Sequence, residues 1–451
     1  MIDLMNVAAY RENNRIEAKK ALGGLPRSIW ETYSAFANAL GGVILLGVQE
    51  HKDTSLSPVN LPDPEGMVRQ FWALMRDGKT VSVNILTEEN VRIAEVDGKR
   101  IIAIEVPRAR RSLRPVYIGG DPMTGTYRRN GEGDYRCKRE EVLEMQRDAA
   151  RQTADMRLLR DVGMDALDTA SVAAYLACVD EDTCDHAALV QLGAVEDLDG
   201  ALHPTAARLL LLGREAEIKR VYPGYSLEFR CMDSAAEHEE STAEFLSGCN
   251  VFDFYNRVME RFYGDFEPEL IPALREALAN SLLNADYHSG GVKVRQTVES
   301  VTFVNAGPFR VDVSAAVSGG VSDPRNLALS RLFARMGVGQ GSGSGLAGIL
   351  TLWRSRGWEP PTIRETFDPA QVTVRLPLKE AEMGALSASA LPYPLQKSAV
   401  LAYITEHIRV SEAEIAAYLG GDGAAAGRCL AELLAEDVLA EDAPGICRLK
   451  R

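Results

Sequence analysis

The sequence lacks the cysteine and histidine spacings of a zinc site or a disulfide framework. Its seven cysteines form no C-x-x-C pair, and its six histidines show no metal-ligand spacing. An odd, scattered set of cysteines is typical of reduced thiols rather than of disulfides or zinc ligands. The cysteines are Cys137, Cys178, Cys184, Cys231, Cys249, Cys429 and Cys447.

Long apolar runs are also missing. The chain has no stretch of about 18 apolar residues, the length that predicts a membrane span. Residues 1–12 lack the basic start and long apolar core of a signal peptide. We therefore expect a cytoplasmic chain that does not enter a membrane.

A phosphate-binding P-loop is absent. Gly78-Lys79-Thr80 resembles the end of one, but position 73, where the first glycine belongs, is Ala73. The sequence consequently does not predict a P-loop motor.

Composition predicts a soluble protein of several domains. The chain has 451 residues, of which 46% are hydrophobic and 25% are charged, and this length suggests two to four domains. Strand and helix patterns predict an α/β (α+β multidomain) fold. We place the domains at residues 1–150, 151–384 and 385–451.

The net charge of −14 is unevenly distributed. Residues 1–150 hold 22 Lys and Arg against 21 Asp and Glu, whereas the remainder holds 28 against 43. Positive side chains are concentrated between residues 108 and 139, with Tyr117, Tyr127 and Tyr135 among them. Phosphate contacts need local positive charge, and aromatic rings can stack on bases. The alternative is a solvated rim of routine ion pairs.

Residues 12–50 carry the most informative pattern. Glu12 and Glu17 precede Lys19, and an amphipathic helix follows that ends at Gly41-Gly42. Glycine stops a helix readily because it adopts positive φ without a Cβ clash. The next run, Val43–Val48, is short, apolar and β-branched, which predicts a buried strand.

This pattern closely resembles the Schlafen-type AlbA-like domain. The resemblance extends to about residue 147 through the strand-like segment 100–107, the Tyr127–Gly131 turn and the short helix around Arg139. It implies nucleic-acid binding, to DNA or RNA. The arginines that we assign to this role are Arg108, Arg110, Arg111, Arg114, Arg128 and Arg129.

In eukaryotic Schlafen relatives the resemblance implies an RNA-cleaving carboxylate cluster. Here Glu12, Glu17 and Glu50 are the candidates, because clustered carboxylates bind divalent cations that activate water. Close carboxylates repel one another unless a cation or a basic group lies among them. Lys19 can supply that group by pairing with Glu17, so we expect a metal-free site, with a metal-dependent ribonuclease as the alternative.

A second constellation begins at Pro268. Glu276, Asn280 and Asn284 are spaced i, i+4, i+8 and so share one face of a predicted helix. Strands over 292–298 and 301–305, a Gly-rich run over 337–348 and a strand over 372–378 follow.

This order resembles the C-terminal domain of the RecG-like family, a diverged GHKL ATPase. The resemblance implies that ATP binds with Mg²⁺, that Glu276 orients the attacking water as a general base and that Asn280 binds the Mg²⁺. Glycines let backbone N–H groups approach phosphates, and Gly341, Gly343 and Gly345 are placed for that.

One position departs from the family pattern. Asn305, followed by Ala306-Gly307, stands where the family has an adenine-reading aspartate. An amide cannot offer the two charged acceptors of a carboxylate. We therefore expect any nucleotide to bind weakly and to turn over slowly; the alternative is a GHKL-shaped scaffold that binds nothing.

Residues 393–451 predict three helices and a final strand over 446–449, an order that resembles a winged helix. This segment has 6 basic and 9 acidic side chains, and its third helix offers only Arg428 for base contacts. We expect it to pack or dimerise rather than to bind DNA. Together these patterns predict a nucleic-acid-binding transcriptional regulator with a diverged ATP-binding domain, a metal-dependent ribonuclease or a ligand-free interaction scaffold being the alternatives.

Overall fold

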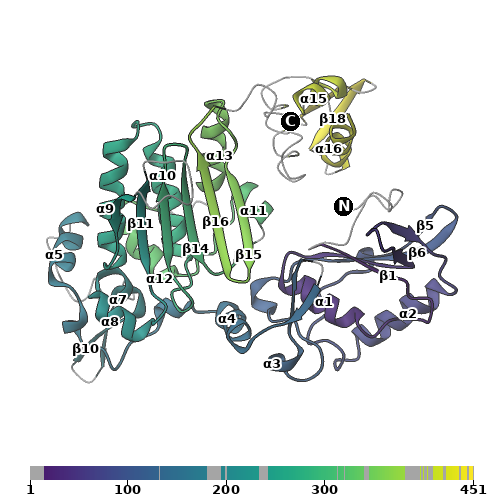
Figure 1. Ribbon diagram of the computed structural model, residues 1–451, viewed down its shortest axis with the longest axis horizontal. Coiled ribbons are helices and arrows are strands. Elements are labelled where there is room, and N and C mark those ends of the chain that lie inside the picture. The colour runs from purple at the N-terminus through teal and green to yellow at the C-terminus, as the bar shows by residue number, and fades with distance from the viewer. Residues whose placement is uncertain are drawn as a thin grey trace. The chain divides into compact units, whose positions relative to one another are not determined.

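The computed structural model divides into two units, Met1–Ala154 and Asp155–Arg451, and each is a mixture of helices and sheets (Figure 1). The residues that the structure describes are 15–131, 133–179, 195–198, 201–232, 242–311, 313–318, 320–339, 345–380, 397, 400, 404, 410–419, 423–435, 438–443 and 446–449.

A four-stranded sheet forms the centre of the first unit, in the order β1-β2-β6-β5. Strand β1 is parallel to β2, whereas the β2–β6 and β6–β5 pairs are antiparallel. The parallel pair needs a crossover connection, which α1 supplies. The bounds are β1 (Ile16–Lys19), α1 (Ile29–Asn38), β2 (Gly42–Leu46), β5 (Val91–Val96) and β6 (Lys99–Val106).

The predicted helix and strand at residues 29–48 are both present, with one interruption. Gly41 has φ +72°, and a Cβ there would lie 2.9 Å from the carbonyl oxygen of Val106. Only glycine fits such a position, so it ends the helix segment as predicted. Gly47 (φ +82°) divides the predicted strand into β2 and β3.

The remaining elements of the first unit surround this sheet. Strand β3 pairs with β4, and β7 pairs with β8 as an antiparallel hairpin. The bounds are β3 (Val48–Glu50), β4 (Leu56–Pro58), α2 (Pro64–Met75), η2 (Glu88–Asn90), η3 (Arg111–Leu113), α3 (Pro122–Gly125), β7 (Tyr127–Asn130), β8 (Gly133–Arg136) and α4 (Arg139–Ala149).

A buried amide joins α1 to two distant segments. Asn38 is fully buried; its Nδ2 donates to the carbonyls of Val116 (2.7 Å) and Tyr127 (3.1 Å), and its Oδ1 accepts from the Val116 N–H (2.8 Å). Ser34, one helical turn earlier, donates to the same Val116 carbonyl. These bonds satisfy buried backbone groups that would otherwise lose their hydration, and they hold β7 against α1.

The second unit is built on a six-stranded sheet in the order β12-β11-β13-β14-β16-β15. Within this sheet only the β11–β13 pair is parallel, and β11, β14, β16 and β15 can be followed in Figure 1. The bounds are β11 (Leu227–Met232), β12 (Thr242–Leu246), β13 (Val292–Gln296), β14 (Ser300–Ala306), β15 (Thr362–Phe367) and β16 (Ala370–Pro377).

Helices pack on one face of this sheet, in a core that includes Phe229, Phe262, Leu274 and Phe303. The helix predicted from Pro268 is α10, and the predicted strands are β13, β14 and β16. The bounds of the helices and of a separate two-stranded sheet are η4 (Ala154–Met156), η5 (Met164–Ala166), α5 (Thr169–Cys178), β9 (Val195–Leu198), β10 (Ala201–Pro204), α7 (Ala206–Leu212), α8 (Glu215–Val221), α9 (Val251–Asp265), α10 (Ile271–Asn284), α11 (Val313–Ser318), α12 (Leu327–Arg335) and α13 (Gly345–Ser355).

The last part of the chain contains two helices and a three-stranded sheet in the order β17-β19-β18. The predicted strand at 446–449 is β19, and β18 pairs with it as a hairpin that the sequence did not indicate. Most of the first predicted helix lies outside the described residues. The bounds are β17 (Val410–Ser411), α15 (Glu412–Tyr418), α16 (Gly423–Ala435), β18 (Leu439–Ala443) and β19 (Ile446–Leu449).

Among the described helices, none combines the length and the apolar character that a bilayer crossing requires.

We predict that Asn38→Leu loosens the first unit. The change leaves two buried carbonyls and one N–H without this partner, and one such loss costs about 1–3 kcal/mol. Hydrogen–deuterium exchange of the full chain should therefore be faster in peptides covering 29–38 and 116–130. Asn60→Leu is the control, because Asn60 is exposed and accepts a single bond from the Arg100 N–H. Equal exchange in the two variants would contradict the role of Asn38.

Candidate functional site

Glu17 lies in β1 and is held by two cations. Its Oε1 is 2.7 Å from Lys19 Nζ, and its Oε2 is 2.8 Å from Arg129 Nη1. The expected Glu17–Lys19 ion pair is therefore present, and Arg129 is a second partner that the sequence did not reveal. With a cation on each oxygen, this carboxylate is compensated without a metal.

Arg129 joins β7 to β1. Its side chain is 1% exposed, and Nη1 also lies 3.0 Å from Asp134 Oδ1, while Nη2 donates to the Ile16 carbonyl. Asp134 in turn accepts from Thr32 of α1 at 2.7 Å. Burial works against the charged guanidinium, but the hydrogen bonds and charges of Asp134 and Glu17 outweigh it and raise the pKa of Arg129. The Arg129 guanidinium therefore links β1, β7 and β8 within the first unit.

The described part of the chain does not assemble the predicted nuclease cluster. Glu50 is exposed at the end of β3, and Glu12 lies outside the described residues. Among the residues that are described, no group of three His, Cys, Asp or Glu side chains could hold a metal ion. Glu17 and Lys19 alone therefore remain of the predicted arrangement, and the cleavage prediction stays a prediction.

The six predicted nucleic-acid-binding arginines divide into two groups. Arg114, Arg128 and Arg129 are buried, and Arg128 forms ion pairs with Glu141 (3.5 Å) and Glu144 (4.0 Å) of α4. Buried guanidinium groups cannot present themselves to phosphates, so the predicted surface loses these three.

The other three arginines differ in exposure. Arg110 is exposed, whereas Arg108 and Arg111 are half-buried. Arg111 donates to the carbonyls of Asp148 (2.7 Å) and Ala150 (3.1 Å) at the end of α4, so much of its donor capacity is used within the unit.

A compact exposed surface follows the β7–β8 hairpin. Tyr135 on β8 is 60% exposed, and Arg136, Lys138 and Arg139, which follow it within four residues of the sequence, are also exposed. Of the three interleaved tyrosines, Tyr127 is buried and Tyr117 is half-buried, so Tyr135 alone offers an open ring. We call Tyr135, Arg136, Lys138 and Arg139 the hairpin surface. In the sequence these residues belong to a longer arginine-rich segment, and the sequence alone did not distinguish them from its buried arginines.

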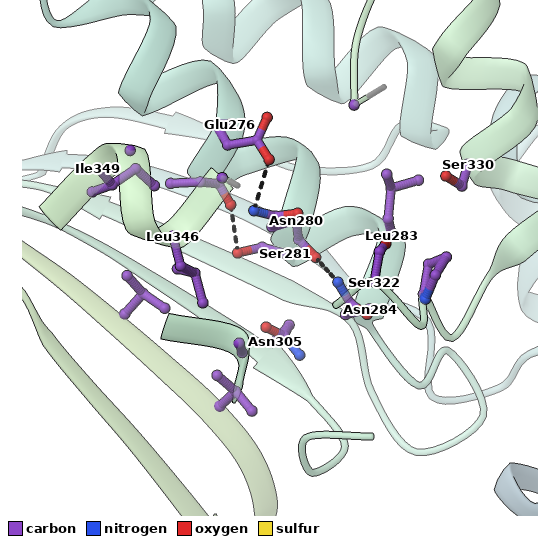
Figure 2. Close-up of a pocket in the computed structure, with 18 of the residues that line it drawn as sticks. Glu276, Asn280, Ser281, Leu283, Asn284, Asn305, Ser322, Ser330, Leu346 and Ile349 are labelled. Atoms are coloured by element: carbon purple, nitrogen blue, oxygen red, sulfur yellow. Dashed lines mark hydrogen bonds between the residues drawn. The ribbon is translucent and has the colours of Figure 1, made fainter. Parts of the chain in front are cut away.

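The second unit contains a cavity of about 580 Å³ between α10, α13 and the sheet. Glu276, Asn280 and Asn284 lie along the α10 side of it, as the i, i+4, i+8 spacing predicted, and Asn305 lies on β14 (Figure 2). This volume is within the range of small-molecule sites. Four predicted nucleotide-site residues, together with Gly345, are thus brought to one cavity.

Hydrogen bonds order the polar side of this cavity. Asn280 Nδ2 donates to Glu276 Oε1 (3.2 Å), and Asn284 Nδ2 donates to the Asn280 carbonyl (2.8 Å) (Figure 2). Because the Asn280 amide nitrogen faces the carboxylate, its Oδ1 is the side-chain atom suited to a cation. Asn305 is buried, and within the described part of the chain its Nδ2 makes one long contact, with the Ala306 carbonyl (3.3 Å).

Two glycines make close approaches at or next to this cavity. A Cβ on Gly345, the first residue of α13, would collide with the Glu276 carboxylate. The helix N-terminus therefore lies against that carboxylate, a position that favours negative charge. Gly307 (φ +88°) lies next to the cavity, where a Cβ would be 2.8 Å from Arg325 Nη2. Gly341 and Gly343 lie outside the described residues.

The cavity also includes residues that we did not predict. Phe309, Arg310 and Asp323 line it, and Arg310 is buried with Nη2 3.6 Å from Asp323 Oδ1. Arg310 also donates to the Pro324 carbonyl at 2.8 Å. The sequence shows only that these three residues lie between β14 and α12. That position does not indicate that they line a cavity.

Comparisons with known proteins identify two segments. Residues 12–138 match the family model described as Schlafen, AlbA_2, and residues 143–228 match a domain of unknown function, DUF8451. No curated protein matches the chain.

Two solved structures are similar. The DIP2311 protein from Corynebacterium diphtheriae is 17% identical with a TM-score of 0.44, over 97% of this chain and 80% of that one. The N-terminal domain of an ATP-dependent DNA helicase RecG-related protein from Nitrosomonas europaea is 31% identical with a TM-score of 0.24, over 30% of this chain and 94% of that one.

We predict that Arg129→Met destabilises the first unit by about 3–5 kcal/mol, because it removes a buried cation and leaves Asp134 without this ion pair and Glu17 with Lys19 alone. Arg136→Met removes the same charge from an exposed position on β8 and should change the stability by less than about 0.5 kcal/mol. Urea denaturation of the full chain, followed by circular dichroism, measures both. Equal stability of the two variants would show that the Arg129 ion pairs do not hold the hairpin.

Proposed function

Because the first unit contains a Schlafen AlbA_2 domain, we propose that the protein is a nucleic-acid-binding regulator. The observation that carries this proposal is the hairpin surface, where an exposed tyrosine is followed within four residues by three exposed cations. Cations neutralise phosphates and release counterions, and an aromatic ring stacks on a base of any sequence. This combination suits binding to DNA or RNA with little sequence preference.

The polar cavity of the second unit supports a regulatory ligand. We propose that it binds a nucleotide with Mg²⁺, with Asn280 Oδ1 holding the cation and Glu276 orienting a water molecule. The donor set fits the cation, because Mg²⁺ prefers oxygen ligands and binds through few protein groups plus phosphates. When bound, Mg²⁺ would neutralise charge on the phosphates.

The binding surface and the cavity suit a regulatory protein better than a helicase-type motor. The sequence has no P-loop, and Asn305 provides a neutral amide where a carboxylate would accept from a base more strongly. Weak binding and slow turnover would make the second unit a sensor of nucleotide rather than a motor. The terminal helices and hairpin over 410–449, for which we keep the winged-helix prediction, would then serve packing or dimerisation.

We predict that replacing Arg136, Lys138 and Arg139 by Ala weakens nucleic-acid binding at all sequences. Each lost phosphate contact should reduce the magnitude of the slope of log K against log salt concentration by about 0.7–0.9, so the triple variant should reduce it by about 2–3. Fluorescence anisotropy with labelled single-stranded and duplex oligonucleotides measures this.

The control for this prediction removes the same charge elsewhere on the unit. Arg69, Arg76 and Lys79 are exposed on or just after α2, and their replacement by Ala should leave the slope nearly unchanged. If both triple variants bind equally, the hairpin surface is not the binding site.

We predict that an unhydrolysable ATP analogue with Mg²⁺ binds with a dissociation constant nearer to 1 mM than to 1 μM, which is about −4 rather than −8 kcal/mol. Asn305→Asp should tighten binding about tenfold, because a charged acceptor strengthens a hydrogen bond from the base. Isothermal titration calorimetry compares the two proteins, with Asn60→Asp as an exposed control. No heat of binding in either would favour the scaffold alternative, and brisk ATP hydrolysis that Glu276→Gln leaves unchanged would refute the assignment of Glu276.

A further inference from the structure

The six-stranded sheet of the second unit has a second face that the cavity does not use. On β13 the buried residues Val292, Val294 and Gln296 alternate with the exposed Lys293 and Arg295. The same alternation occurs on β16, where Val374 and Leu376 are buried and Arg375 lies between them. Because successive strand side chains point to opposite faces, Lys293, Arg295 and Arg375 lie on the face away from the helical core.

Strand register places these cations in rows across the sheet. Arg230 is the partner of Arg295, Arg295 of Thr302, and Thr302 of Arg375. Directly paired residues share a face, and neighbouring strands are about 4.8 Å apart. The three arginines therefore span roughly 14 Å in one row.

A second row runs parallel to the first. Lys293 pairs with Val304, Val304 with Thr373, and Thr373 with Arg364 of β15. Residues two apart along a strand are about 6.6 Å apart, so the rows are close enough for one extended chain of phosphates to contact both.

The charge of this face contrasts with that of its surroundings. Residues 151–451 carry 28 Lys and Arg against 43 Asp and Glu, yet the described strand positions on this face hold five cations and one carboxylate, Glu228. Arg230 pairs with Glu228 at 3.5 Å. Among the described residues, Lys293, Arg295, Arg364 and Arg375 have no ion-pair partner. Adjacent positive charges create a positive electrostatic potential on this face, and that potential favours the binding of an anion.

An aromatic side chain extends the first row. Phe245 on the edge strand β12 is the partner of Arg230 and is 53% exposed. The Arg230 guanidinium lies 5.2 Å from the centre of its ring. An open ring beside an arginine is a platform on which a base can stack. We call Phe245, Arg230, Lys293, Arg295, Arg364 and Arg375 the basic face.

We propose that the basic face binds the backbone of a single-stranded nucleic acid. Rows of cations complement a chain of phosphates, and Phe245 offers stacking that an acidic peptide or a lipid headgroup would not use. Thr302 and Thr373 lie between the cations and supply hydroxyl groups for sugar or phosphate oxygens. The proposal concerns the second unit and does not depend on the hairpin surface of the first.

The test compares charge reversal on this face with an equal reversal elsewhere in the full chain. The face variant is Lys293→Glu, Arg295→Glu and Arg375→Glu. The control is Arg214→Glu, Lys219→Glu and Arg220→Glu, on and next to α8, where the side chains are exposed and pair with glutamates. Net charge changes equally in both, so a difference reports the location.

Fluorescence anisotropy with labelled 30-nucleotide oligo(U) and oligo(dT) over a salt series measures the effect. We expect the face variant to bind at least about tenfold more weakly, with the salt slope lowered by about 2, which is 0.7 for each of three phosphate contacts. The control should retain the parent affinity within about twofold. Equal loss in both variants would overturn the proposal.

Combination with the hairpin variant separates this proposal from the proposed function. Additive losses support both sites. If the hairpin variant alone removes all binding, the basic face is refuted while the proposed function stands. If only the face variant weakens binding, the basic face stands and the hairpin surface is refuted as the binding site. Binding of the parent, but not of the face variant, to phosphatidylserine vesicles with unchanged oligonucleotide binding would assign the face to lipid and overturn the proposal.

Neutral substitutions keep the test valid if the charge-reversal variant fails to fold. Lys293→Gln, Arg295→Gln and Arg375→Gln remove the charges without introducing repulsion and should weaken binding in the same direction by a smaller factor. Phe245→Leu keeps an apolar side chain but removes the ring, and it should weaken oligonucleotide binding with little change in salt slope. Parent-like affinity of the Gln variant would refute the face even if the Glu variant fails to fold.

Discussion

The alternation of side chains along the central strands of the second unit is the constraint on which both of its surfaces depend. On β14, Phe303 and Asn305 face the helices, whereas Thr302 and Val304 face the other way. A slip of one residue in the pairing would exchange the two sets and turn the cavity residues outward. The same register therefore fixes the polar cavity on one face and the row of cations on the other.

In the first unit, ion pairs inside the fold use some of the arginines, so only the remaining cations can contact a nucleic acid. Arg128 and Arg129 follow one another on β7, and both are consumed by carboxylates within the unit. Breaking such pairs is costly because the remaining charge is desolvated. The hairpin is thereby anchored on β1 and α1, and the next cations along the chain, from Arg136 to Arg139, are left at the surface.

Local patterns in the sequence predicted much of this architecture. The Gly41 helix end, the β6 strand and the α10 face with Glu276 and Asn280 all depend on residues within a few positions of each other. Asp168 caps α5 in the same local way, because its side chain accepts from the Ser171 N–H at 2.8 Å. Such features follow from turn and helix geometry and need no distant contact.

Contacts between distant segments could not be predicted in the same way. Arg129 and Glu17 are far apart in the sequence, so the sequence does not show that they pair. For this reason the arginines between 108 and 139 could not be divided into buried and exposed ones from the sequence. The basic face is a further example, because Arg230, Arg295 and Arg375 come from three strands and meet only through sheet order. The edge strands β12 and β15 were not predicted, and without them neither Phe245 nor Arg364 could be placed.

The central claim is that this chain contacts nucleic acid at defined surfaces of the two units. Photocrosslinking of the full chain to a 4-thiouridine-labelled single-stranded RNA, followed by mass spectrometry of the peptides, tests it most directly. The account predicts crosslinks in peptides containing residues 133–139 and in those containing Phe245 or 293–295. Crosslinks confined to other peptides, or none above the level of a bovine serum albumin control, would contradict it.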